Sequence, residues 1–182
     1  MSARGEQLHA TATTDGQIAE LISLLITADR STLRRPCGGR EKLGDGTIAA
    51  NAWHTAENYQ RIAEFASPEW PAEHRPASHR ADPVPRIMPT VTHRPPDYGA
   101  NPRSHGDRYA ADDLEVKTVL EQLATTRRSL RRIGELTDQQ LDAVPPEGSF
   151  RFCDGQRTLE QVLASLLKHQ RHQLDALHTA SS

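Results

Sequence analysis

The chain has 182 residues, with 22 lysines and arginines against 24 aspartates and glutamates, so its formal net charge is −2. One domain with a real core is the simplest organisation at this length. The balanced charge creates no overall field that would recruit nucleic acid or an anionic membrane, so binding must come from a local site. No stretch approaches the roughly 18 to 20 apolar residues that cross a bilayer, and the first residues lack the apolar centre of a signal peptide. We therefore expect a cytoplasmic protein without nucleic-acid or membrane partners.

The periodicity of apolar residues predicts an all-α protein. Residues 1–13 are expected to form a disordered tail, and a first helix is expected over residues 15–35, ending at Pro36. A second helix is expected over residues 46–66, with Asp45 or Thr47 as its N-cap. Its buried stripe comprises Ile48, Ala52, Thr55, Tyr59 and Ile62.

Residues 67–111 have a different character, because nine of the twelve prolines fall there with almost no apolar periodicity. Loops of this length in a compact domain are usually functional covers or disordered segments. Four histidines are scattered along this loop without zinc-finger spacing, and they are interpreted as solvated or lid residues rather than a second metal site. They are His74, His79, His93 and His105. Tyr98 and Met88 are the expected anchors of the loop on the helices.

A third helix is expected over residues 112–136, with four arginines at positions 127, 128, 131 and 132. On an acidic chain without interleaved aromatic residues, such arginines are typical of a solvated face. Arg127 differs because it falls within the apolar stripe between Leu123 and Leu130. Two interpretations stay open for it: a side chain whose stem covers the core, or an anion clamp at the rim of a pocket.

Two capping-box patterns mark the last part of the chain. The first, Thr137 to Gln140, predicts a short helical turn near Leu141, and the second, Thr158 to Gln161, opens the last helix. Between them, residues 150–152 alternate like a short extended segment before a turn. The apolar face of the last helix comprises Leu159, Val162, Leu163, Leu166, Leu167, Leu174 and Leu177.

Helical geometry decides which polar residues of the last helix can act together. His169 and Gln173 fall on the edge of the apolar face, one turn apart, whereas His172 lies roughly 60° away and should face solvent. On the second helix, Asn51 and Asn58 flank His54 at the border of its buried stripe. A polar row beside an apolar face suits the wall of a cleft, although a lone histidine at such a border is commonly structural.

These segments resemble the DinB/YfiT-like superfamily over about three quarters of the chain. NAWHTAENYQ, with His54, is similar to the family phrase LxHxxxxE, and RTLEQVLASLLKHQRHQLDAL, with His169, is similar to its fourth-helix phrase ending in HxxxH. LEQLATTRRSLRRIGELTDQQLDAV resembles the family's third helix and the phrase after it. The resemblance implies an antiparallel four-helix bundle with up-down-down-up connectivity, covering residues 14–180, with the Pro-rich loop between helices two and three.

The resemblance also implies a divalent-metal site, zinc or nickel, with His54 and His169 as ligands. The chain departs from the family where the third histidine would stand, because Gln173 occupies that position and His172 is one residue off. A neutral amide oxygen is a poor ligand for such metals, so a tightly held ion is the less expected outcome.

Two function classes follow from the resemblance. The first is a metal-dependent S-transferase that activates a low-molecular-weight thiol such as mycothiol or bacillithiol, or a hydrolase that uses metal-bound water. Gln173 or His172 would then be the third ligand. The second is a non-catalytic bundle that binds or sequesters a small molecule through the polar residues around His54 and His169. A homodimer is also an open alternative, and Cys37 and Cys153 are expected to be ordinary thiols.

Overall fold

The computed structural model describes residues 2–13, 16–38, 43–66, 111–112 and 114–182. Within these residues all regular secondary structure is helical, apart from an isolated bridge between Pro36 and Thr47, so the all-α prediction is confirmed. The helices are α1 (Ala3–Thr13), α2 (Gln17–Thr27), α3 (Arg30–Leu33), α4 (Ile48–Phe65), α7 (Val116–Ser129), α8 (Arg131–Glu135), α9 (Asp138–Asp142) and α10 (Leu159–Ser181). No described helix carries an apolar run that would cross a lipid bilayer.

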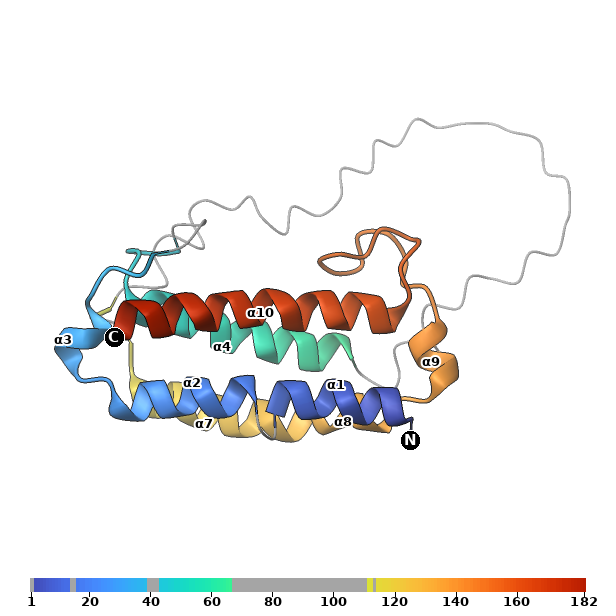
Figure 1. The fold of residues 1–182 in the computed structure, drawn as a ribbon, viewed down its shortest axis with the longest axis horizontal. Coiled ribbons are helices and arrows are strands. Elements are labelled where there is room, and N and C mark those ends of the chain that lie inside the picture. The colour runs from blue at the N-terminus through green and yellow to red at the C-terminus, as the bar shows by residue number, and fades with distance from the viewer. Residues whose placement is uncertain (1, 14–15, 39–42, 67–110, 113) are drawn as a thin grey trace, which may run out of the picture.

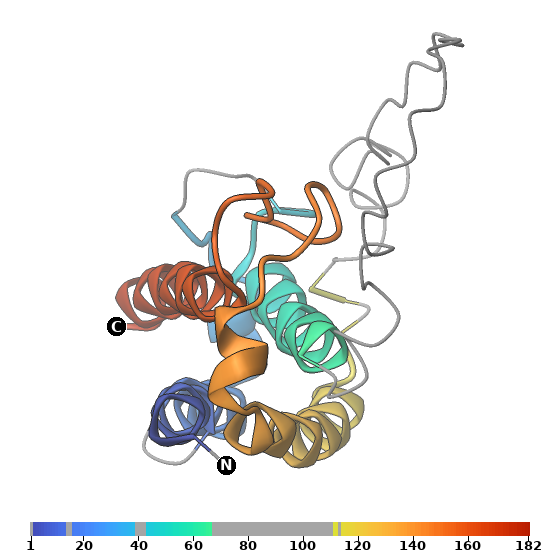
Figure 2. The same cartoon turned by 90° about the vertical axis from the view of Figure 1, so that its right-hand side faces the viewer.

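The long helices lie side by side in two layers (Figures 1 and 2). In one layer α1 and α2 lie end to end beside α7 and α8, and in the other α4 lies beside α10. Figure 1 shows that α4 and α7 run in one direction, whereas α1, α2 and α10 run in the other. Residues 67–110, between α4 and α7, lie outside the described residues. They include the loop histidines and the expected anchors Tyr98 and Met88.

Local capping explains where several helices begin. The Thr47 hydroxyl accepts a hydrogen bond from the Ala50 amide at 3.2 Å, so Thr47 is the N-cap of α4. Thr137 and Thr158 both form the expected capping boxes, at the starts of α9 and α10. Each such cap stabilises its helix by about 1 kcal/mol. The stripes predicted for α4 and α10 are buried in full.

The expectation of a disordered tail at residues 1–13 is wrong, because α1 occupies most of it. This helix has a weak apolar face, so its own sequence does not predict a helix. Residues that are distant in the chain hold it in place. The Arg4 guanidinium bonds to Asp138, Asp142 and Glu160 at 3.0–3.1 Å. Tertiary contacts of this kind stabilise helices that would not form alone.

Two predicted helices are each divided in the structure. The segment expected as one helix over residues 15–35 becomes α2 and α3, because Ala28 is extended and Asp29 caps a new turn. The helix expected over residues 112–136 starts at Val116 and is interrupted at Leu130. Residues 150–152 form a bend followed by a turn rather than the predicted extended segment. Both cysteines are free, as expected.

Candidate functional site

His54 occupies the middle of α4 and is 8% exposed. Its Nε2 atom lies 2.9 Å from the side-chain nitrogen of Asn58, one helical turn further on. Residues four apart share a helix face, which explains this pairing. Asn51 is also buried, but its amide nitrogen donates to the Thr47 carbonyl at 2.9 Å. Asn51 therefore supports the start of α4, and Asn58 is the amide that reaches His54.

His169 lies on α10 at the level of His54. Thr55 follows His54 and Gln170 follows His169, and the side-chain nitrogen of Gln170 donates to the Thr55 carbonyl at 2.9 Å. This bond fixes the two histidines at the same level of the two helices. His169 and Gln173 are both half-buried, whereas His172 is exposed, as the helical geometry predicts. The structure therefore places His54, Asn58, His169 and Gln173 along the seam between two adjacent helices, α4 and α10.

The loop between α9 and α10, residues 143–158, folds over this seam (Figures 1 and 2). The Phe150 ring stacks on Phe65 of α4 with a centroid separation of 4.7 Å. Phe152 meets His169 of α10 edge-on at 6.3 Å. Between these two aromatic residues, Arg151 places its Nη1 atom 3.1 Å from Nε2 of His169. One short loop thus contacts both helices of the seam.

The backbone of this loop is held in an unusual shape. Phe152 has a φ of 69°, in the left-handed region that a bulky side chain rarely adopts. The turn is closed by bonds from the Gly148 amide to the Cys153 carbonyl at 2.9 Å and from the Cys153 amide to the Phe150 carbonyl at 3.1 Å. Strain of this kind costs about 1–3 kcal/mol and clusters at functional sites. This backbone conformation places the side chains of Arg151 and Phe152 against His169.

The hydrogen bonds define the neighbours of the two imidazole rings. A guanidinium only donates, so Arg151 offers an N–H group to Nε2 of His169. The side-chain nitrogen of Asn58 faces Nε2 of His54. The seam therefore presents two imidazoles whose Nε2 atoms both lie within hydrogen-bond distance of a side-chain nitrogen.

This arrangement does not fit a tightly bound divalent metal. Nε2 of His169 is engaged by a cationic guanidinium, which would repel a metal ion at that atom. Gln173 stands where the resemblance would require a third histidine, and His172 is exposed. Among the described residues, no three histidine, cysteine, aspartate or glutamate side chains are close enough together to hold an ion.

Arg127 does not lie within the apolar stripe of α7, where the spacing placed it between Leu123 and Leu130. It is exposed, and Thr126 is the buried residue at this level of α7. The buried face of α7 comprises Val119, Leu123 and Thr126, and Arg127 lies about 100° around the helix from Thr126, outside that face. Arg127 acts electrostatically on His9 of α1 and so belongs to the α1 side of α7, away from the seam.

Three residues of the site escaped the sequence interpretation: Phe150, Arg151 and Phe152. The alternation of aromatic and charged residues before Asp154-Gly155 indicated only an extended segment, and it was the one local pattern that marked these three residues. Nothing local indicates that the segment folds onto α4 and α10, because its contacts reach Phe65 and His169 at distant positions in the chain.

Comparisons with models of protein families, with curated proteins and with solved structures gave no match to this chain.

Proposed function

We propose that this chain is a DinB-like four-helix bundle with up-down-down-up connectivity, and that it binds a small carboxylate at the seam between α4 and α10. The observation that carries the proposal is the bond between Arg151 and His169. It places a planar guanidinium beside an imidazole, within a loop that packs on both helices. Guanidinium groups recognise carboxylates through paired hydrogen bonds.

The composition of the seam supports a ligand with an apolar body. Phe152 and the stacked pair of Phe65 and Phe150 supply aromatic surface beside the polar row of His54, Asn58 and His169. Small-molecule sites usually combine an apolar lining with a few polar groups that fix orientation. In the bound state the carboxylate would replace His169 as the partner of Arg151, and the imidazoles would bond to the remaining polar atoms of the ligand.

A metal-dependent thiol S-transferase is the second candidate. It is favoured by the position of His54 and His169 at one level of two adjacent helices. This activity requires the ring nitrogen that Arg151 engages and a third ligand where Gln173 stands. We therefore rank it below carboxylate binding.

The test of carboxylate binding is a titration with a set of aromatic and aliphatic monocarboxylates, followed by NMR. We expect a saturable shift of the His169 ring signals, weakened about tenfold or more in Arg151→Ala. Arg157→Ala is the matched control, because Arg157 belongs to the same loop but pairs with Asp154 at 3.1 Å. Equal loss in both variants would refute a specific role for Arg151.

Metal content separates the two candidates. For carboxylate binding, we expect the purified protein to hold no stoichiometric zinc or nickel, even after incubation with either ion. The double variant Arg151→Ala/Gln173→His removes the cation and restores a third histidine, so it should bind zinc more tightly than the natural chain. Stoichiometric metal in the natural chain that disappears in His54→Ala/His169→Ala would favour the S-transferase instead.

A further inference from the structure

A groove of about 450 Å³ lies between α1 and α10. Its walls include Arg4, Leu8 and Thr11 from α1, and Ala164, Leu167 and Lys168 from α10. A further hollow of about 360 Å³ continues it past Thr11 toward the start of α2. Volumes of this size are typical of sites for small molecules. The residues that form the seam between α4 and α10 do not line this groove.

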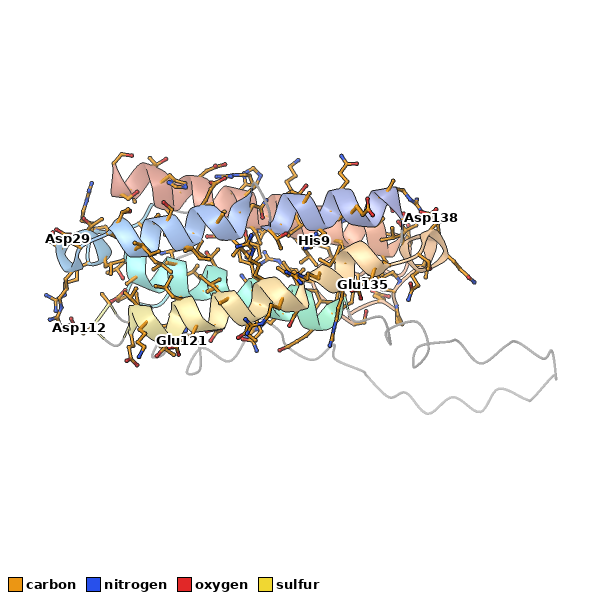
Figure 3. The ribbon with its side chains drawn as sticks, turned by 90° about the horizontal axis from the view of Figure 1, so that it is seen from below. His9, Asp29, Asp112, Glu121, Glu135 and Asp138 are labelled. Atoms are coloured by element: carbon orange, nitrogen blue, oxygen red, sulfur yellow. The ribbon has the colours of Figure 1, made fainter. Side chains whose placement is uncertain are left out.

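The groove exists because α1 packs so closely on α8. A methyl group on Gly5 would lie only 2.7 Å from the Ile133 carbonyl oxygen, and Figure 3 shows His9 on the same α8 side of α1. Leu8 lies roughly 60° to 100° around the helix from Gly5 and His9, on the side toward α10. The residue of α10 in that wall, Ala164, is small and exposed. Close packing on one helix therefore leaves space beside the other.

Ion pairs stand at both ends of the groove, with their charges already balanced. At one end the Arg4 guanidinium lies 3.0 Å from the Glu160 carboxylate. At the other end Arg171 donates to both carboxylate oxygens of Glu20 at 2.7 and 2.8 Å. Because a glutamate stands at each end, a ligand with several negative charges would be repelled.

Lys168, between these two ends, is a cation of the lining without a described counter-charge. It is exposed, and no described carboxylate forms an ion pair with it. It lies on the face of α10 that carries Ala164 one turn before it. Leu8, Ala164 and Leu167 supply apolar wall beside it. A single unpaired cation next to an apolar wall matches a ligand with one negative charge at the end of an apolar body.

We propose that the groove between α1 and α10 binds an alkyl monocarboxylate. The carboxylate pairs with the Lys168 ammonium, and the alkyl chain lies along Leu8, Ala164 and Leu167. Each methylene group that leaves water on binding strengthens the affinity by up to about fourfold, so chain length contributes more than the exposed ion pair. Nucleotides and acidic peptides fit less well, because Glu20 and Glu160 flank the site. The inference does not depend on carboxylate binding at the seam.

The experiment is a titration of the full chain with octanoate, followed by the NMR signals of the Leu8 and Ala164 methyl groups. We expect saturable shifts at both residues, and weaker binding of the shorter hexanoate. Lys168→Gln should weaken octanoate binding by about three- to fivefold, the size expected of an ion pair open to solvent. The matched control is Lys117→Gln, which removes the same charge from α7, where Lys117 lies 4.0 Å from Glu121, and should leave the affinity unchanged.

A second pair of variants tests the shape of the groove. Ala164→Leu fills the space beside Leu167 and should weaken octanoate binding by about tenfold or more. Ala124→Leu makes the same change at an exposed position of α7 and should leave binding unchanged. Arg151→Ala should bind octanoate at the groove as the natural chain does, which separates this site from the seam.

Three outcomes would overturn the proposal. One is the lack of a saturable shift at Leu8 and Ala164. Another is binding of the neutral octanol as tightly as octanoate, which would mean that Lys168 does not select the ligand. The third is equal weakening by Lys168→Gln and Lys117→Gln, which would mean that the general charge of the protein attracts the anion. Thermal unfolding of the variants, compared with the natural chain, controls for loss of the fold.

Discussion

Tyr59 is fully buried, and its hydroxyl donates to the side-chain oxygen of Gln17 at 2.8 Å. The nitrogen of the same amide donates to the Leu167 carbonyl at 3.0 Å. Gln17 is 4% exposed, so its amide depends on these two partners. The three residues belong to α2, α4 and α10, and a buried polar network of this kind favours one arrangement of the helices over others.

Replacing Tyr59 with phenylalanine should lower the free energy of unfolding by about 1–3 kcal/mol, because the Gln17 oxygen would stay buried without a donor. Urea unfolding of both proteins measures the difference. Gln170→Met is the comparison, since it removes one hydrogen bond, to the Thr55 carbonyl, together with a buried oxygen that accepts no hydrogen bond in the structure. That variant should change stability by less than about 1 kcal/mol. A larger loss in Gln170→Met than in Tyr59→Phe would contradict this account.

At the scale of the elements, the crossing of α1 and α8 depends on close backbone approach. A methyl group on Gly5 would lie 2.7 Å from the Ile133 carbonyl oxygen and 3.3 Å from that of Leu136. Both are main-chain atoms, which move only if a helix moves. Glycine at this position therefore sets how closely the two helices pack.

Gly5→Ala should destabilise the protein by about 1–3 kcal/mol, because α1 must shift away from α8. Gly134→Ala tests the opposite case on the partner helix, where the nearest atoms are at ordinary contact distances from 3.5 Å. There the higher helix propensity of alanine should leave stability unchanged or raised by up to about 1 kcal/mol. Thermal unfolding of the two variants side by side decides the matter, and equal destabilisation by both would show that Gly5 has no special role.

At the scale of the whole molecule, Glu20 joins the two layers. Its carboxylate accepts from both terminal nitrogens of Arg171 at 2.7 and 2.8 Å and lies 3.2 Å from the His178 ring. The hydrogen bond from Arg171 is the main reason that the pKa of Glu20 lies below its usual value of 4.5. The side chain is about a third exposed, so solvent weakens the contribution of this pair to stability.

The lowered pKa gives stability a defined pH dependence. The native state holds the Glu20 carboxylate more strongly than the unfolded chain does, so the contribution of this bond is fully present above pH 4.5 and is lost as pH falls through the lowered native pKa. When the pH falls below 4.5, the free energy of unfolding should therefore decrease less in Glu20→Gln than in the natural chain. Urea unfolding across this pH range measures the effect. If the free energy of unfolding of the two proteins changes in parallel with pH, Glu20 is not a source of the pH dependence.

The sequence by itself determined the helical class, the capping boxes at Thr137 and Thr158, and the buried stripes of α4 and α10, and it narrowed the cap of α4 to Asp45 or Thr47. These features depend on residues three or four positions apart, so a local pattern contains the whole cause. The exposure of His172 and the partial burial of His169 follow from the same geometry.

Only the tertiary structure decided that residues 3–13 form a helix, that Arg127 lies on the α1 side of α7, and that Arg151 reaches His169. The first and the last of these depend on partners far away in the chain: Asp138 and Glu160 for α1, and α10 for the loop. Contacts between distant residues stabilise conformations that local propensity does not favour, which is why no periodic pattern predicted them.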